Sequence, residues 1–230
     1  MRKKIVVLSG AGISAESGLK TFRDSDGLWE NYRIEEVATP EAFKNNPALV
    51  LQFYNERRDS ILATQPNPAH LALVELESQY EVSIITQNID DLHERAGSTA
   101  VLHLHGEITK VRSCNPVKPL YYPYNEPLQV GQVGEDGYQL RPHIVWFGEP
   151  VPMIEKAATI VCTADIVLVI GTSLNVYPAA GLLQYTPYNK PIYVIDKKIP
   201  AVGAYPNLYK FEQIASIGVK QVVDLLLKGK

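Results

Sequence analysis

A glycine-rich stretch near the start of the chain has the spacing of a phosphate-binding turn. The apolar run over residues 5–8 predicts a buried strand, and the segment from Gly10 to Gly18 follows it directly. Gly10, Gly12 and Ala15 fit the looser dinucleotide pattern G-x-G-x-x-A. Glycines at this place let the backbone approach a pyrophosphate closely, while the amides of a following helix face its charge. A structural turn without a ligand is the alternative for this stretch alone.

Polar side chains follow a second apolar run, over residues 82–86. Gln87, Asn88 and Asp90 come directly after it. Ligands of an open parallel sheet bind beyond the carboxyl ends of the strands, so these side chains are placed to hydrogen-bond a ribose and an amide. The alternative is that they cap the helix predicted over residues 91–96. Since one cap needs one residue, capping leaves Gln87 and one of the other two unexplained.

Two histidines, His103 and His105, lie two residues apart in a third run and are predicted to share one face of a strand. His105 stands directly before Gly106, again at the ligand-binding end of its strand. An imidazole with a pKa near neutrality can act there as a base. The alternatives are a structural histidine and half of a metal pair, although the sequence offers no third ligand nearby.

Small hydroxyl residues and an acid follow two further apolar runs. The tripeptide Gly171-Thr172-Ser173 comes after residues 165–170, where it suits phosphate or ribose contacts, with a helix N-cap as the alternative. Asp196 ends the run over residues 191–196. An acid at this position can accept a hydrogen bond from a ribose hydroxyl or serve as a turn residue.

A helix opened by Asn46-Pro47 carries a cation on its inward face. Its buried stripe is predicted to consist of Val50, Tyr54, Arg57 and Ile61. An arginine on such a stripe is costly unless an anion satisfies it, and the phenol of Tyr54 lies one turn away. The alternative is an arginine that snorkels to the surface beside an exposed Arg58.

The apolar runs over residues 5–8, 82–86, 100–104, 165–170 and 191–196 alternate with helix-like segments. One helix is predicted to start at Asn67-Pro68 and a last one after Ser216. This alternation predicts an α/β fold with a Rossmann-like parallel sheet. Two insertions, residues 32–63 and 112–140, interrupt this alternation and are predicted to form a second, smaller module. The nucleotide-binding domain is predicted to consist of residues 1–31, 64–111 and 141–230.

Composition limits the classes of function. The chain has 230 residues, 46% of them hydrophobic, and a net charge of −3, which gives no support for nucleic-acid binding. No apolar run approaches the ~18 residues that span a bilayer, and the run behind the basic residues 1–4 is too short for a signal peptide. We therefore expect a cytoplasmic protein. The two cysteines, Cys114 and Cys162, exclude a disulfide framework and a four-cysteine zinc site.

Seven motifs follow one another over nearly the whole chain. They are Gly10-Ala11-Gly12-Ile13-Ser14, Thr21-Phe22-Arg23, Gly27-Leu28-Trp29, Thr86-Gln87-Asn88-Ile89-Asp90, His105-Gly106, Val145-Trp146-Phe147-Gly148-Glu149 and Gly171-Thr172-Ser173. Taken together, and in this order, they resemble the sirtuin family of NAD-dependent protein-lysine deacylases.

The segment Phe53-Tyr54-Asn55-Glu56-Arg57 resembles the class III sirtuin signature, in which a tyrosine and an arginine three residues on bind an acidic acyl group. The spacing lets both groups converge on one carboxylate. The resemblance implies succinyl- and malonyl-lysine as substrates, with glutaryl- and acetyl-lysine as further candidates.

The resemblance also implies a set of site residues. Catalysis falls to His105, as general base on a ribose hydroxyl, and to Asn88. The NAD-binding set is Gly10, Ala11, Gly12, Ile13, Ser14, Phe22, Arg23, Trp29, Gln87, Asn88, Ile89, Asp90, Gly171, Thr172, Ser173, Asp196, Lys197 and Ala215. The acyl-lysine is bound by Tyr54, Arg57, Val145, Phe147, Gly148 and Glu149, entering as an extended strand between residues 145–149 and 174–177. The products are nicotinamide, O-acyl-ADP-ribose and free lysine.

One departure from the family concerns metal. Sirtuins typically carry four zinc-binding cysteines after the catalytic histidine, and this interval holds only Cys114. We therefore expect no structural zinc, and an apolar cluster from the proline- and tyrosine-rich residues 116–127 in its place. Two other functions remain open for this fold: a protein ADP-ribosyltransferase or NAD glycohydrolase, and a non-catalytic NAD sensor.

Overall fold

A six-stranded parallel sheet forms the centre of the larger part of the molecule, as the alternation of strands and helices predicts. The structure, a computed structural model, describes residues 2–20, 28–29 and 32–229. The strand order is β11-β10-β9-β1-β4-β5, with every neighbouring pair parallel. The strands are β1 (Lys4–Ser9), β4 (Glu81–Thr86), β5 (Val101–His103), β9 (Ile166–Ile170), β10 (Ile192–Asp196) and β11 (Leu208–Glu212).

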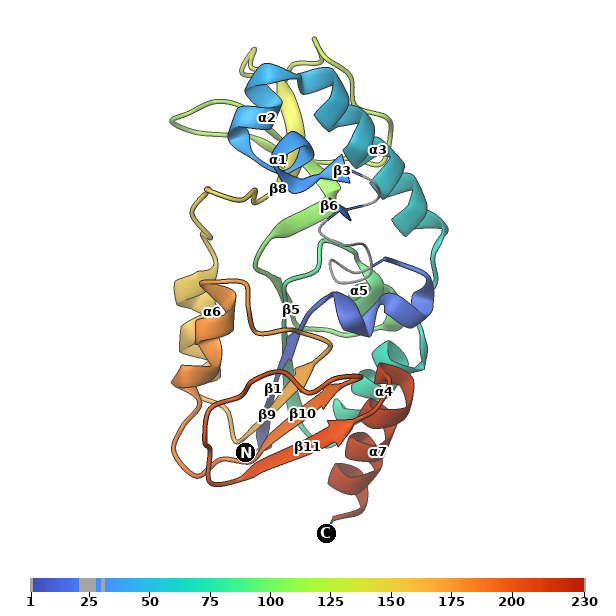
Figure 1. The fold of residues 1–230 in the computed structure, drawn as a ribbon, viewed down its shortest axis with the longest axis vertical. Coiled ribbons are helices and arrows are strands. Elements are labelled where there is room, and N and C mark those ends of the chain that lie inside the picture. The colour runs from blue at the N-terminus through green and yellow to red at the C-terminus, as the bar shows by residue number, and fades with distance from the viewer. Residues whose placement is uncertain (1, 21–27, 30–31, 230) are drawn as a thin grey trace.

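Helices cover both faces of this sheet (Figure 1). Ile5 and Val7 of β1 point toward α4 (Pro68–Leu76) and α7 (Ala215–Lys228) in one core cluster. Val6 points the other way, toward α6 (Ile154–Val161) and the 3-10 helix η3 (Ala179–Tyr185). Because alternate side chains of one strand enter two cores, the strand is apolar at nearly every position.

Most helix ends follow the sequence signals. Asn67 caps α4, with its side chain accepting from the Ala69 amide at 2.9 Å. Gly97, with φ +108°, ends α5 (Leu92–Ala96). The last helix begins at Ala215, before the expected start, so Ser216 lies inside it. Its hydroxyl and amide both donate to the Glu16 carboxylate, at 2.6 and 2.8 Å, which takes the place of a cap.

The helix expected after the first glycines is absent in that form. Two short 3-10 turns, η1 (Ala11–Ile13) and η2 (Ala15–Ser17), follow β1 instead, and Gly18 ends the second with φ +99°. Several amides of this segment already have acceptors: Gly12 donates to the Gly171 carbonyl and Ser14 donates to the Ala11 carbonyl.

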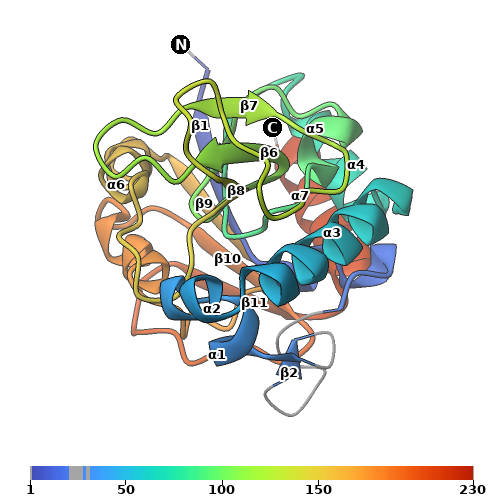
Figure 2. The same ribbon diagram turned by 90° about the horizontal axis from the view of Figure 1, so that it is seen from above.

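The smaller module lies beyond the carboxyl ends of the parallel strands, at the top of Figure 1. It combines α1 (Ile34–Val37), α2 (Pro40–Asn45) and α3 (Pro47–Ala63) with a three-stranded antiparallel sheet, which Figure 2 shows from above. The sheet has the order β7-β6-β8 and contains β6 (Gly106–Ser113), β7 (Tyr121–Pro123) and β8 (Leu140–Ile144). The short strand β2 (Leu28–Trp29) pairs antiparallel with β3 (Tyr32–Arg33). The strands β6 and β8 reach beyond the expected insertion of residues 112–140.

Apolar packing occupies the interior of this module. A cluster of buried residues unites α3 with the antiparallel sheet and the loop before β8, and Tyr122 and Tyr124 of the proline- and tyrosine-rich segment pack against it. Its buried members are Leu51, Val111, Leu128 and Leu140. Within the described ranges, no group of three or more histidine, cysteine or acidic residues is placed to hold a metal ion.

The alternative interpretation of α3 placed Arg58 at the surface, but this residue is 1% exposed. Its guanidinium donates to the carbonyls of Ile108 and Glu126 and to Asn55 Oδ1, each at 3.0 Å. These acceptors offset the cost of burying the charge, and they tie α3 to β6 and to the loop after β7. Within the described residues, no helix combines the length and hydropathy needed to cross a membrane.

Candidate active site

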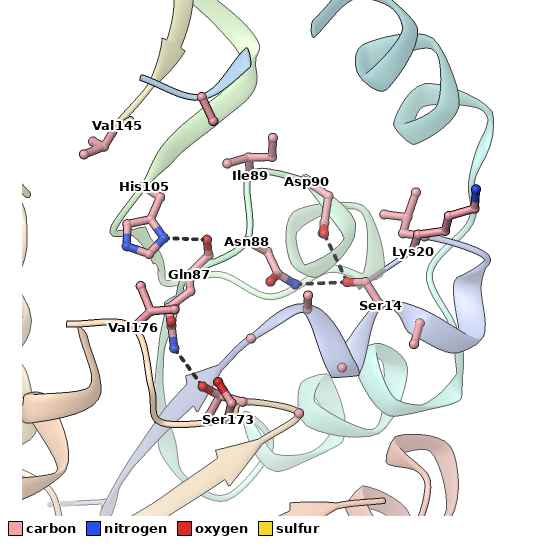
Figure 3. Close-up of a pocket in the computed structure, with 18 of the residues that line it drawn as sticks. Ser14, Lys20, Gln87, Asn88, Ile89, Asp90, His105, Val145, Ser173 and Val176 are labelled. Carbon is pink, nitrogen blue, oxygen red and sulfur yellow. Dashed lines mark hydrogen bonds between the residues drawn. The ribbon is translucent and has the colours of Figure 1, made fainter. Parts of the chain in front are cut away.

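A cavity of about 540 Å³ lies between the carboxyl ends of the parallel strands and the smaller module. Most of the predicted site residues line it, and Figure 3 shows the part around His105 and Asp90. Those lining it are Gly10, Ala11, Gly12, Ser14, Gln87, Asn88, Ile89, Asp90, His105, Gly171, Thr172, Ser173, Asp196, Lys197, Ala215, Tyr54, Arg57, Val145, Phe147 and Glu149.

Two of the predicted residues that the structure describes do not line the cavity. Ile13 is fully buried in the core beside β1, so its side chain supports the turn from behind. Gly148 lies just outside the cavity wall, in a turn with φ +88°. Phe22 and Arg23 lie outside the described residues, and so does the side chain of Trp29 in β2.

The glycines after β1 are required by the close approach of another backbone. The Gly12 amide donates to the Gly171 carbonyl at 2.8 Å. A Cβ at Gly12 would lie 2.6 Å from Gly171 Cα, and one at Gly10 would lie 2.9 Å from the Gly171 oxygen. Gly171 itself has φ +60°, a conformation that favours glycine. The loops after β1 and β9 are therefore packed backbone to backbone, which leaves their outer surface to the cavity.

A buried polar network crosses the floor of the cavity (Figure 3). The Ser14 hydroxyl donates to Asp90 Oδ2 at 3.1 Å and accepts from the Asn88 amide group at 3.1 Å. Asp90 Oδ1 accepts from the Leu92 amide at 3.2 Å, which also fixes the start of α5. Thus Asp90 both accepts from the first amide of the helix and belongs to the site.

Burial raises the pKa of Asp90, although the Leu92 amide and the Ser14 hydroxyl both work in the opposite direction. The carboxylate is 5% exposed. An acceptor that is so enclosed selects a ligand with a hydrogen-bond donor, such as a carboxamide. On the other side of the network, Gln87 Nε2 donates to Thr172 Oγ1 at 3.0 Å and links the loops after β4 and β9.

His105 was expected to end its strand, but it lies in the short connection between β5 and β6, two residues beyond the end of β5. Its Nδ1 is 3.0 Å from the Gln87 carbonyl, which can only accept, so Nδ1 carries the proton and Nε2 holds a lone pair. Burial lowers the pKa of His105, against the effect of the Gln87 carbonyl. The ring is therefore neutral near pH 7, as a general base must be.

The connection that carries His105 is pinned to the smaller module. The Val145 amide donates to the His105 carbonyl at 2.9 Å. Gly106 has φ +83°, and a Cβ there would overlap the His143 carbonyl of β8. The backbone on both sides of the imidazole is thus fixed by β8 and the residue that follows it.

Tyr54 and Arg57 line the cavity from α3, on the side of the smaller module. The Tyr54 side chain is fully buried, and its Oη accepts from the Trp146 indole at 3.0 Å. Burial raises the pKa of Tyr54, so the phenol keeps its proton, which points away from Trp146. Arg57 is 8% exposed, and one of its nitrogens donates to the Lys20 carbonyl at 3.4 Å. The predicted inward stripe of α3 is therefore confirmed.

Glu149 was expected to contact the substrate, but its carboxylate is held within the protein. Arg141 binds both of its oxygens, at 2.7 and 3.0 Å, and Arg112 adds a third contact at 3.0 Å. The Trp146 amide also donates to it, at 2.8 Å. These cations and this amide hold the pKa of Glu149 below its usual value against the effect of burial. Glu149 therefore shapes the loop at residues 145–149, and its side chain has little capacity left for a ligand.

The amides of that loop are mostly engaged as well. Val145, Trp146, Phe147 and Glu149 donate to His105, Glu149, Ala38 and Trp146. Within the described part of the chain, Gly148 is the only residue of the five whose amide has no acceptor. A peptide docked as an extended strand would therefore pair with Gly148 and with carbonyl groups.

Several cavity residues were not predicted. Trp146 was missed although it lies in the same motif as Val145, and its indole gives Tyr54 a partner. Ala15 lies in the predicted glycine-rich pattern, and Val176 and Tyr177 lie in the segment 174–177 predicted to flank the peptide, although none was named as a site residue. The others come from segments with no chemical signal of their own, so only the folded chain could reveal them. They are Leu19, Lys20, Ile34, Ala38, Val151, Pro178, Ile195 and Lys198.

Comparison with known families decides the identity. The model of the Sir2 family matches residues 10–178. The chain belongs to the Sir2 family. Proteins named NAD-dependent protein deacylase are similar over 98% of this Sir2 chain and 98% of their own: one from Bacteroides thetaiotaomicron is 51% identical over 230 residues and one from Helicobacter pylori is 55% identical over 226.

Solved Sir2 structures share the fold. A mutant Sir2 homologue in complex with ADP-ribose is 37% identical, with a TM-score of 0.89 over 99% of this chain and 93% of that one. A Sir2 homologue in complex with NAD is 36% identical, with a TM-score of 0.85 over 99% and 91%. A Sir2 bound to an acetylated peptide is 28% identical, with a TM-score of 0.76 over 97% and 93%.

The lining of the Sir2 cavity fits NAD. The close-packed glycine turns leave room for a pyrophosphate beside them, although the amides of Gly10, Gly12 and Gly171 themselves donate within the protein. The buried Asp90 carboxylate suits the carboxamide of nicotinamide. Asp196, which is 7% exposed and accepts from the Lys198 amide at 3.1 Å, bounds the cavity on the side of β10.

Proposed function

We propose that this Sir2 protein, an NAD-dependent protein deacylase, acts on lysine side chains that carry acidic acyl groups, above all succinyl and malonyl. The general activity follows from its family and from relatives of that name over nearly its whole length. The proposal on the acyl group is supported by Tyr54 and Arg57, which present a buried phenol and a guanidinium to the same cavity as His105.

The guanidinium of Arg57 is the observation that carries this proposal. A cation that is 8% exposed at the wall of a cavity favours an anionic ligand, because low local dielectric strengthens the pairing. A succinyl or malonyl group ends in a carboxylate, and a planar guanidinium can hold a carboxylate with two hydrogen bonds. The Tyr54 phenol, whose Oη accepts from the Trp146 indole, lines the same cavity and is proposed as the second contact for that carboxylate. An acetyl group offers neither contact.

The remaining residues would each bind a different part of NAD along the cavity. Gly10, Ala11, Gly12 and the loop of Gly171, Thr172 and Ser173 would hold the phosphates, and Asp196, Lys197 and Ala215 the adenosine end. Gln87 and Asn88 would reach the nicotinamide ribose, and Ile89 and Asp90 the carboxamide. Phe22, Arg23 and Trp29 stay part of the proposed cofactor site on sequence grounds.

Bound NAD supplies the ribose carbon that receives the acyl oxygen, with nicotinamide as the leaving group. His105 would then remove a proton from a ribose hydroxyl, using the Nε2 lone pair that its Nδ1–Gln87 bond leaves available. The network of Ser14, Asn88 and Asp90 would hold the sugar and the carboxamide in place. An acylated lysine of a protein or peptide, entering past Gly148, completes the site.

Turnover on one peptide that bears a succinyl, malonyl, acetyl or no acyl group tests the proposal. Nicotinamide release should require an acyl group and should be fastest with the acidic ones. Release from NAD without acylated peptide would instead indicate the glycohydrolase or ADP-ribosyltransferase alternative. No release with any peptide would indicate an NAD sensor. A cytoplasmic location is part of the proposal and would be checked by cell fractionation.

A further inference from the structure

His103, at the end of β5, contacts the segment that carries Gln87, Asn88 and Asp90, and it has no part in the reaction proposed above. Its side chain is 7% exposed. Nδ1 is 2.9 Å from the Asn88 carbonyl, and Nε2 is 2.8 Å from Glu94 Oε1 on α5. The ring therefore bridges the loop after β4 to the helix that follows it.

Both partners of this ring can only accept hydrogen bonds. A backbone carbonyl has no proton to donate, and a carboxylate has none either. The pKa of Glu94 is lowered, against the effect of burial, by its hydrogen bond to His103, so the acid is ionised. A neutral imidazole carries a single N–H and can satisfy only one of two acceptors. Both contacts are hydrogen bonds only when the ring carries two protons.

We propose that His103 is a positioning residue that works as an imidazolium, holding the Asn88 carbonyl on one side and Glu94 on the other. It thereby fixes the backbone of the segment that carries Gln87, Asn88 and Asp90. This inference rests on the roles proposed for Asn88 and Asp90. His105 holds the adjacent Gln87 carbonyl in the same way but must be neutral, so two imidazoles on neighbouring carbonyls act in opposite protonation states.

The charged groups around His103 favour its charged form. On α5, Glu94 faces it directly, and His93, whose pKa burial lowers well below its ordinary value, is neutral. On β6, the carboxylate of Glu107 is paired with Lys110 at 2.8 Å. Burial opposes a charge on the His103 ring, but Glu94 and the Asn88 carbonyl outweigh it and raise its pKa.

The positive charge of His103 also affects the protonation of Asp90 in the proposed cofactor site. Burial raises the pKa of Asp90, and His103 is among the groups that oppose this rise. Loss of the charge would therefore favour a protonated Asp90, in addition to releasing one of the two bonds that hold the loop.

Opposite requirements on the two rings predict a bell-shaped dependence of kcat on pH. The acid limb belongs to His105, whose pKa burial lowers and which must lose its proton to act. The alkaline limb belongs to His103, whose pKa is raised and which must keep its proton. As the pH rises through the pKa of His103, the bridge loses one N–H and kcat falls.

The test compares the dependence of kcat on pH in the wild type, in Glu94→Gln and in a matched control, Glu75→Gln. The control also removes one exposed carboxylate, but Glu75 lies on α4, where it pairs with Lys220. A glutamine can still accept from Nε2, but it no longer stabilises the imidazolium by charge. We expect Glu94→Gln to move the alkaline limb to lower pH by about 1–3 units, the usual effect of one adjacent opposite charge. The acid limb should stay, and Glu75→Gln should follow the wild type.

Two further measurements keep the outcome decisive. His103→Gln should abolish the alkaline limb and lower kcat about tenfold, since one charged hydrogen bond to the loop is lost. An NMR titration of the ring nitrogens in the full chain without ligands should give His103 a pKa above that of an ordinary histidine. The pKa of His103 should be lower in Glu94→Gln than in the wild type.

An alkaline limb that is identical in Glu94→Gln and the wild type would overturn the inference, as would a His103 ring that titrates at or below the ordinary value. A role in stability alone would lower the melting temperature of these variants and leave the shape of the profile unchanged. Failure of the proposed function would appear separately, as wild-type protein without acyl-dependent turnover, and the NMR titration does not depend on turnover.

Discussion

The exchange Arg57→Met tests the acyl pocket most directly. The substitution keeps most of the aliphatic length on α3 and removes the guanidinium from the cavity wall. A hydrogen bond to a charged group contributes about 1.5–3 kcal/mol, so the loss should lower kcat/KM for a succinylated peptide by about 10- to 150-fold. The same peptide with an acetyl group has no carboxylate to lose a partner, and its kcat/KM should change by less than about threefold, within the ±0.5 kcal/mol of a neutral substitution.

The assay is nicotinamide release under identical conditions with the two peptides, and the decisive quantity is the ratio of the two kcat/KM values. Arg2→Met is the matched control, because this arginine is exposed and donates to the Glu77 carbonyl at the opposite end of the sheet. It should leave the ratio unchanged. Equal losses with both peptides in Arg57→Met would mean that the guanidinium holds the protein together and does not select the acyl group.

Three other substitutions have clear expected outcomes. His105→Ala should lower kcat by about 10²–10⁴-fold while calorimetry still detects NAD binding, and full turnover would exclude the base. Gly12→Ala should destabilise the fold by about 1–3 kcal/mol and weaken NAD binding, because its Cβ would lie 2.6 Å from Gly171 Cα; an unchanged denaturation midpoint would contradict this packing. Arg58→Met should cost about 1–3 kcal/mol in urea unfolding by stranding the Ile108 and Glu126 carbonyls, unless water reaches them.

The sequence predicts the central sheet because the inner strands bury both faces. In β1, β9 and β10 nearly every residue is apolar and buried, so short apolar runs reveal them. The edge strand β11 was not predicted, since it is only partly buried and carries Lys210 at its centre. The same is true of β6, where polar residues such as Glu107 and Lys110 alternate with buried ones.

Most of the predicted site residues directly follow a strand. Their place could be predicted because a strand of the parallel sheet positions the residues after its end at the ligand-binding edge of that sheet. Contacts between distant segments could not be predicted in this way. Arg58 is satisfied by carbonyls 50 and 68 positions away, and no local pattern encodes such partners. The engagement of Glu149 by Arg141 likewise depends on how β8 and the following loop fold back on themselves.

The place of His105 in the chain has a mechanical consequence. Only Leu104 and His105 separate β5 of the parallel sheet from β6 of the antiparallel one, so the imidazole stands on the shortest link between the two halves of the molecule. The Val145 amide holds the His105 backbone on the smaller module, while the ring bonds to Gln87 of the other half, so we expect a change in the angle between the halves to strain the contact between His105 and Gln87. A compound bound between the halves should therefore inhibit by moving the ring away from the proposed position of the ribose, without contacting the ring.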